Sequence, residues 1–143
     1  MASSRSVAAR RAHTAYAAYL EGCRLDEDEL TYDRAEAAYR KAIELDGTLA
    51  SAYTNLGNLV FRRGHASEAE RLYRAALVVD GGQPEALYNL GFLAYERGDV
   101  AEAAQLFAAA LAKDPGFADA HFNLAMAYED LGRPADARAE WEA

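Results

Sequence analysis

The sequence repeats with a period of 34 residues, and this repeat constrains the fold more than any other feature. Two rows align without a gap, from Ala50 to Gln83 and from Pro84 to Phe117. An incomplete row follows over residues 118–143, and a more divergent one precedes them over residues 16–49. Rows of this length each form one small unit that buries its apolar face against its neighbours. The sequence therefore predicts a repeat array rather than a single irregular core.

Columns of small and aromatic residues recur at fixed places in the rows. The small residue is followed twelve positions later by an alanine and sixteen positions later by an aromatic residue. The small column is Cys23, Gly57, Gly91 and Ala125; the alanine column is Ala35, Ala69, Ala103 and Ala137; the aromatic column is Tyr39, Tyr73, Phe107 and Trp141. We expect the small residues to face the alanines where two antiparallel helices cross closely. A bulky side chain there would force the helices apart, at about 1–3 kcal/mol.

Each row predicts two amphipathic helices, because its apolar residues follow three-four spacing in two separate stripes. Gly98 lies between the stripes of the third row, where it is expected to end the first helix in a left-handed conformation, and Asp99 is expected to cap the next helix. Gly64 and Gly132 hold the same place in the second and fourth rows. Asp114-Pro115-Gly116 is expected to end the second helix of the third row.

Composition agrees with an all-α protein and excludes several classes of function. The sequence is rich in alanine, the best helix former, and has only three prolines. A formal net charge of −8 argues against direct nucleic-acid binding, which needs concentrated Lys and Arg. A single cysteine excludes a disulfide framework, and no apolar run approaches the ~20 residues that span a bilayer.

No signature of catalysis is present. No glycine-rich segment is followed by Lys-Ser or Lys-Thr, so a phosphate-binding loop is not expected. His13, His65 and His121 lie in different parts of the repeat pattern, which does not suggest a metal site. We therefore expect a non-enzymatic, soluble cytoplasmic protein without a metal, a cofactor or a membrane partner.

The columns resemble the tetratricopeptide repeat, a 34-residue helix-turn-helix that carries W-x2-L-G-x2-Y, then A-x3-F, then P. The matching residues are Tyr53, Leu56, Gly57 and Val60; Leu87, Leu90, Gly91 and Ala94; and His121, Leu124, Ala125 and Tyr128. The resemblance implies an all-α solenoid of about four repeats, at 16–49, 50–83, 84–117 and 118–143. It implies a right-handed superhelix, in which the first helix of each repeat lines a concave groove. Residues 1–15 form a basic N-terminal extension.

The first row departs from the family pattern. Gly22-Cys23 stands where a Leu-Gly pair belongs, and the acidic run Asp26–Glu29 leads to Leu30 where the turn glycine should be. This row also resembles the opening repeat of tetratricopeptide segments attached to bacterial MerR-type regulators. No DNA-binding segment precedes it in this sequence, so that resemblance says nothing direct about DNA.

The resemblance implies that the groove is the functional site, and that the chain is a scaffold or adaptor that binds a peptide or helix of a partner protein. In peptide-binding members, an asparagine in the Asn-Leu-Gly or Asn-Leu-Ala context reaches the backbone of an extended ligand, since an amide both donates and accepts. The predicted groove residues are Asn55, Asn58, Tyr88, Asn89, Phe92, Tyr95, Phe122, Asn123 and Met126. An asparagine that bonds only within the scaffold is the alternative.

The groove composition predicts a partner segment with apolar anchors and basic flanks. Exposed aromatic residues suit apolar anchors, and Glu85, Glu96, Asp119, Glu129 and Asp130 would ring the C-terminal part. A clamp for a terminal carboxylate is disfavoured, because Thr54, Asp119 and Asn123 stand where basic residues would be needed. Two other functions stay open: self-association through an uncapped C-terminal end, and a regulatory segment of a bacterial transcription regulator.

Overall fold

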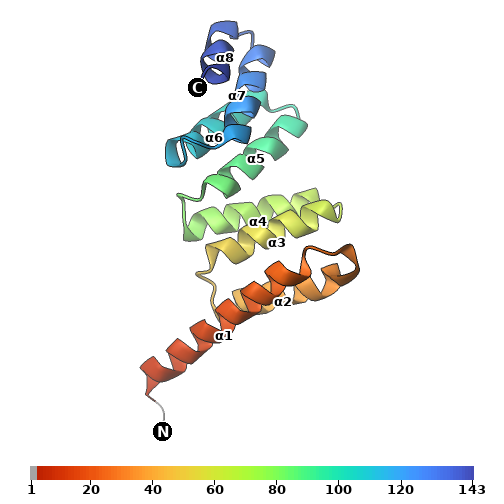
Figure 1. The fold of residues 1–143 in the computed structure, drawn as a ribbon, viewed down its shortest axis with the longest axis vertical. Coiled ribbons are helices and arrows are strands. Elements are labelled where there is room, and N and C mark those ends of the chain that lie inside the picture. Colours follow the sequence, from red (N-terminus) through yellow and green to blue (C-terminus); the bar gives the residue numbers. More distant parts are fainter. Residues whose placement is uncertain (1–2) are drawn as a thin grey trace. The chain divides into compact units, whose positions relative to one another are not determined.

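The computed structural model describes residues 3–143 as a succession of helical hairpins, without a β-strand in that range (Figure 1). The hairpins are α1 (Ser4–Leu25) with α2 (Tyr32–Leu45), α3 (Ala50–Arg62) with α4 (Ala66–Val79), α5 (Pro84–Glu96) with α6 (Val100–Lys113), and α7 (Ala118–Asp130) with α8 (Pro134–Trp141). A short 3-10 helix, η1 (Glu29–Thr31), lies between α1 and α2. The all-α repeat fold predicted from the columns is confirmed.

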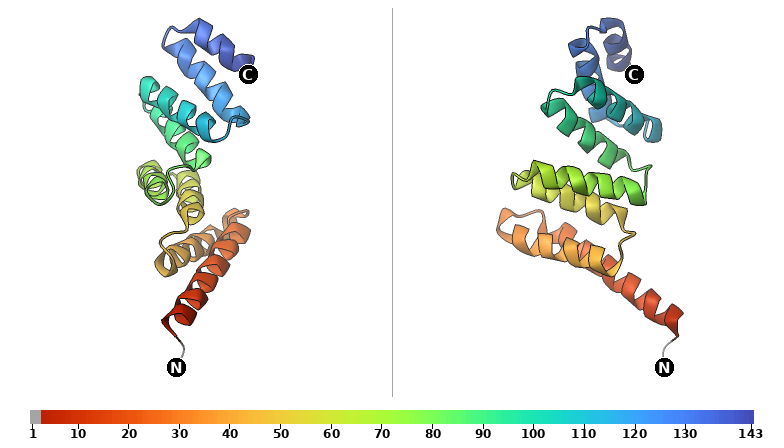
Figure 2. Two further views of the ribbon diagram at one scale, coloured as in Figure 1. Left: turned by 90° about the vertical axis from the view of Figure 1, so that its left-hand side faces the viewer. Right: turned by 180° about the vertical axis from the view of Figure 1, so that it is seen from behind.

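The helices divide into two compact units, one that ends at Val79 and one that begins at Asp80. In the first unit α1 packs on α2, α3 packs on α4, and α2 packs on α3. In the second unit α5 packs on α6, α6 on α7, and α7 on α8. Two further views of the ribbon show the antiparallel course of each hairpin (Figure 2).

Three hairpins turn at a glycine in the left-handed region, as predicted. The φ angles are +90° at Gly64, +90° at Gly98 and +72° at Gly132, a region that only glycine adopts without strain. After Gly98, the Asp99 N–H donates to the Ala94 carbonyl at 2.9 Å, which closes the end of α5. The prediction that the Asp99 side chain caps α6 was wrong. Its carboxylate accepts a hydrogen bond from Arg97 Nε at 3.0 Å instead, and it makes no capping bond.

Within the hairpins, a glycine of the first helix lies flat against an aromatic ring of the second. A Cβ added at Gly57 would lie 2.7 Å from Tyr73 Cε1, and one added at Gly91 would lie 2.7 Å from Phe107 Cε1. Both rings are buried. The atoms nearest to these two glycines belong to the aromatic ring sixteen residues further on, a contact that the sequence analysis did not predict.

In the first hairpin the close crossing lies one residue earlier than predicted. A Cβ added at Gly22 would lie 2.6 Å from Tyr39 Cδ1, whereas Cys23 is only half-buried. Six residues (26–31) connect the two helices, against three in each later hairpin, and the connection winds through η1. The Asp28 carboxylate accepts a hydrogen bond from the Leu30 N–H at 3.0 Å, and Tyr39 Oη donates to Asp26 Oδ2 at 2.5 Å. The longer turn shifts the first row out of the common register.

The first helix begins at Ser4, so residues 4–15 continue α1 upstream of the first repeat. Arg11, on this upstream part, donates from Nε to the Leu45 carbonyl at 3.0 Å and from Nη2 to the Glu44 carbonyl at 3.3 Å. These carbonyls lie at the C-terminal end of α2, where backbone acceptors lack intrahelical partners. A cationic side chain there also complements the helix dipole.

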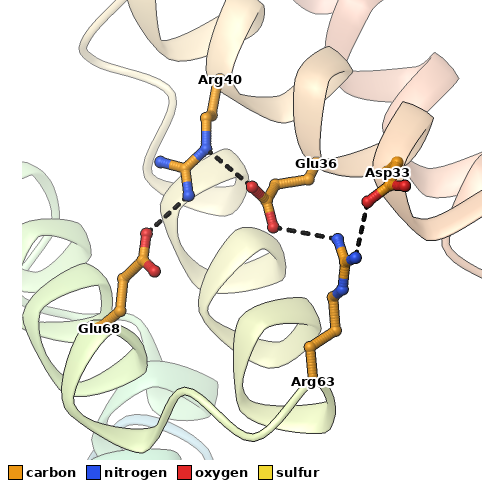
Figure 3. A network of polar contacts seen from close by, with 5 residues as sticks. All are labelled: Asp33, Glu36, Arg40, Arg63 and Glu68. Atoms are coloured by element: carbon orange, nitrogen blue, oxygen red, sulfur yellow. Dashed lines mark hydrogen bonds and ion pairs between the residues drawn. The ribbon is translucent and has the colours of Figure 1, made fainter.

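A network of ion pairs joins α2 to the α3–α4 hairpin (Figure 3). Arg63, just past the end of α3, bonds Asp33 at 2.6 Å and Glu36 at 3.3 Å on α2. Arg40 bonds the same Glu36 at 3.3 Å and reaches Glu68 on α4 at 2.6 Å. Because two guanidinium groups share one carboxylate, the pairs act together. Solvent-exposed networks of this kind add modest, salt-dependent stability.

Candidate functional site

A pocket of about 120 Å³ opens among three helices of the unit that begins at Asp80. Helix α5 contributes Phe92, Tyr95 and Glu96, α6 contributes Phe107, and α7 contributes Phe122, Asn123 and Met126. Most of these side chains are aromatic or apolar. Of the groove residues predicted from the sequence, the structure therefore brings Phe92, Tyr95, Phe122, Asn123 and Met126 together.

The helical period explains why these side chains converge. On α7, Phe122 and Met126 are four residues apart and so lie on one face of the helix. Phe92 holds the same place in α5 that Met126 holds in α7, one repeat earlier. Phe107 is fully buried and forms the floor, whereas Phe122 is 54% exposed and stands at the rim.

Tyr88 lies beside the pocket rather than in its lining. Its ring packs on Phe107 and Phe117, with centroid distances of 5.6 Å and 4.9 Å. The Asn123 amide donates from Nδ2 to Tyr88 Oη at 2.8 Å. Burial raises the pKa of the Tyr88 phenol, so it stays protonated. Asn123 keeps a second N–H and a carbonyl oxygen that can pair with a ligand.

The asparagines of the other unit make bonds within the scaffold. Asn55 Nδ2 donates to Tyr19 Oη at 3.4 Å and lies 3.5 Å from Cys23 Sγ. Asn58 Oδ1 accepts a hydrogen bond from Tyr73 Oη at 2.6 Å. Neither residue lines the pocket. Sequence reasoning left open whether the column of Asn55, Asn89 and Asn123 bonds a ligand or the scaffold, and Asn55 contacts the scaffold, as does Asn58.

Two lining residues of the pocket have polar counterparts in the second hairpin. In the second hairpin the two positions hold Asn58 and Tyr73, joined by the hydrogen bond just described. In the third they hold Phe92 and Phe107, both of which line the pocket. Because Phe107 has no hydroxyl group, it cannot donate a hydrogen bond to the residue at position 92. Sequence reasoning placed Phe107 in a packing column only; the joint change from Asn and Tyr to Phe and Phe was the signal for its second role.

One end of the pocket carries negative charge. Tyr95 Oη donates to the Asp130 carboxylate, and Glu96 lies next to Tyr95 in the lining. The hydrogen bond to Asp130 raises the pKa of the Tyr95 phenol, and the charge of Glu96 adds to this effect. Helices α5 and α7 end at Glu96 and Asp130, and neither has a basic residue in its last turn. The negative ends of both helix dipoles reinforce these carboxylates.

Other reactive groups have structural partners. His121 Nδ1 lies 2.7 Å from Glu140 Oε2, and Nε2 lies 2.8 Å from the Pro115 carbonyl oxygen. These two acceptors raise the pKa of the imidazole, the carbonyl contact most strongly. Among residues 3–143, no three His, Cys, Asp or Glu side chains are grouped as metal ligands. Over the same residues, no helix is both long enough and apolar enough to span a bilayer.

Tandem helical hairpins with a repeated glycine–aromatic crossing define a helical-repeat protein. Family models described as Tetratricopeptide repeat match residues 19–78 and 54–116, and a further one matches residues 94–142. The chain therefore belongs to the tetratricopeptide repeat family. No curated protein matches it.

Solved structures share the fold at low sequence identity. MamA is 23% identical with a TM-score of 0.79, over 90% of this chain and 74% of MamA. The first tetratricopeptide domain of Spaghetti (RPAP3), bound to the HSP90 peptide SRMEEVD, is 20% identical with a TM-score of 0.77, over 85% of this chain and 95% of that one. PilF of Pseudomonas aeruginosa is 25% identical with a TM-score of 0.78, over 92% of this chain and 60% of PilF.

Proposed function

We propose that the chain is a non-enzymatic protein-interaction module whose α5–α7 pocket holds an apolar side chain of a partner segment. The observation that carries this proposal is an open pocket of about 120 Å³ lined by Phe, Tyr and Met side chains. A dry, apolar cavity of about 150 Å³ is large enough for benzene. A branched aliphatic side chain therefore suits the volume of this pocket.

The lining is well suited to recognition. Phe122 is exposed at the rim, and Met126 has a flexible thioether that adapts to different occupants. Burying one aliphatic side chain contributes about 1.5–3 kcal/mol. The amide of Asn123 offers hydrogen bonds to the backbone of the occupant, and Tyr88 holds that amide in place. We include the neighbouring Asn89 in the proposed contact surface.

The charge at the pocket favours basic flanks and disfavours an acidic ligand. The HSP90 peptide bound by the Spaghetti domain carries several carboxylates. Glu96 and Asp130 would repel such a sequence here. We propose a partner with apolar anchors and basic flanks.

Self-association is the second candidate, favoured by an exposed aromatic pair on α7 and α8. Phe122 and Trp141 are 54% and 45% exposed, and their rings pack edge to face with centroids 5.1 Å apart. Light scattering from micromolar to millimolar concentration separates the two candidates. A rising molar mass supports self-association, and a constant monomer mass contradicts it.

The pocket is tested with a small neutral probe, an acetylated and amidated tetrapeptide with leucine and glutamine at its centre. The chain has two methionines, so methyl labelling of methionine gives two NMR signals, and Met126→Leu identifies the one in the pocket. We expect millimolar peptide to shift the Met126 signal with saturation. An unchanged signal throughout the titration contradicts the proposal.

The matched variant places the polar pair of the second hairpin, an asparagine and a tyrosine, at positions 92 and 107 of the third hairpin. In Phe92→Asn with Phe107→Tyr, the new phenol is expected to donate to the new amide, as Tyr73 does to Asn58. The fold should be kept, because the ring still lies against Gly91. The pocket lining should become polar at both positions, and the peptide should no longer shift the Met126 signal. A variant that stays helical and responds like the wild type overturns the assignment of the site.

A further inference from the structure

We infer that the occupant of the pocket carries a lysine or arginine next to its apolar side chain, and that this cation binds at the end formed by Tyr95, Glu96 and Asp130. The inference rests on the proposed function and specifies the partner of the same site. It follows from the placement of two carboxylates, from the helix ends that bear them, and from the pairing of the nearby arginines.

Of the two carboxylates, Glu96 lines the apolar pocket and Asp130 adjoins it through the hydroxyl of Tyr95, which is a lining residue. Glu96 is the last residue of α5, and Asp130 is the last residue of α7, one repeat later. Tyr95 connects them, because it lies next to Glu96 in the lining and donates its hydroxyl to Asp130. A ligand that fills the pocket with an apolar side chain thus meets two negative charges and a phenol ring.

These carboxylates stand where helices are least able to stabilise them. A helix C-terminus carries partial negative charge, so basic residues are favoured in the last turn. Helices α1 and α3 follow this preference with Arg24 and Arg62, whereas α5 and α7 do not. Acidic residues at both helix ends add to the negative potential, and a bound cation relieves it. This is a reason, independent of the pocket, to expect a positively charged ligand.

The nearby arginines of the chain are directed to other acceptors. Arg97 bonds Asp99 at 3.0 Å and Glu102 at 3.1 Å. Arg133 bonds Asp136 and lies over the Tyr128 ring, 4.6 Å from its centroid.

Within residues 3–143, no ion pair involves Glu96 or Asp130. A cation from the partner would form the ion pair with Glu96 and Asp130 that no side chain of this part of the chain forms. The face of an aromatic ring adds to the attraction for an ammonium or guanidinium group.

The experiment extends the neutral tetrapeptide to a matched series. Glutamine is replaced by lysine, by arginine or by glutamate, and lysine is placed either before or after the leucine. The full chain is titrated at low salt, and the Met126 methyl signal reports binding at the pocket. We expect the better lysine peptide to bind about two- to fivefold more tightly than the glutamine peptide, the upper part of the range of exposed ion pairs. The glutamate peptide should bind more weakly than either.

Variants separate the cation site from general attraction to an acidic protein. In Glu96→Gln with Asp130→Asn, the lysine and glutamine peptides should bind equally. In Asp114→Asn the lysine preference should remain, because Asp114 follows α6 at the opposite end of the hairpins and its cap to the Gly116 N–H is kept. At 1 M salt the preference should disappear, since charges are screened within about 3 Å.

The outcomes are distinct. Equal binding of the lysine and glutamine peptides to the wild type overturns the cation site and leaves the pocket proposal intact. A lysine preference that survives in the double variant also overturns it. If no peptide shifts the Met126 signal, the proposed function itself fails.

Discussion

Replacing Gly57 by alanine should destabilise the second hairpin, although alanine is the better helix former. The gain in helix propensity is about 1 kcal/mol. Against it, the new Cβ would lie 2.7, 2.9 and 3.2 Å from Cε1, Cδ1 and Cζ of Tyr73. The ring is 3% exposed, and its hydroxyl is held by Asn58 at 2.6 Å, so the ring cannot move aside freely.

Overpacking of this kind costs about 1–3 kcal/mol, and a strained hydrogen bond adds to it. We therefore expect Gly57→Ala to lower the free energy of unfolding by about 1–2 kcal/mol net. For a domain of this size, the melting temperature should fall by about 2–8 °C. Thermal and urea unfolding, followed by circular dichroism at 222 nm, measure both quantities.

Two comparisons isolate the cause. Adding Tyr73→Leu should remove most of the penalty of Gly57→Ala, which a double-mutant cycle shows as a coupling energy. Ala125→Gly, at the same row position in α7, should lose the helix propensity of about 1 kcal/mol and the burial of one methyl group, because Ala125 is fully buried. If Gly57→Ala is as stable as the wild type or more so, the close ring contact is not what selects glycine here.

Two further predictions concern charged groups. Arg63→Met should lower stability slightly at low salt and by less at 1 M salt, because the guanidinium bonds Asp33 and Glu36 in a partly exposed network; melts at both salt concentrations test this. His121 has a pKa raised above its ordinary value of 6.5, so its contribution is fully present below pH 6.5 and is lost as the pH rises through the higher folded pKa. Wild-type stability should therefore fall over that range relative to His121→Gln, and parallel profiles from pH 5.5 to 8.5 would contradict the role given to this imidazole.

The positions of helices and turns could be predicted from the sequence because each depends on local rules. The left-handed glycines, such as Gly98, follow from the need for φ > 0 after a helix. The register of the first hairpin could not be predicted in this way. Gly22 and Tyr39 are seventeen positions apart, whereas Gly57 and Tyr73 are sixteen apart, so a fixed period aligns Cys23 where Gly22 makes the contact with Tyr39. An insertion in a turn leaves no mark on the periodicity of the helices.

The site was harder to predict because it depends on which side chain faces which across neighbouring repeats. The period placed Phe92 and Met126 on the faces that form the pocket. It could not show that the Asn55 amide is engaged by Tyr19, 36 residues away in the sequence. That contact depends on the longer turn of the first hairpin as well as on side-chain rotamers.

The aromatic column connects packing and recognition, and the two can change separately. Contact with glycine fixes the ring at the same depth in both hairpins, since the added Cβ would be 2.7 Å from Tyr73 and 2.7 Å from Phe107. The two rings differ only at the para position, where Tyr73 carries a hydroxyl group and Phe107 carries hydrogen. Where the ring carries a hydroxyl, as in Tyr73, the residue that faces it must accept a hydrogen bond, and Asn58 does so. Without one, a buried amide would lose its partner at about 1–3 kcal/mol, so an apolar residue such as Phe92 is favoured there. The loss of one hydroxyl therefore selects a second apolar side chain, and together they leave an apolar pocket while the helix crossing stays the same.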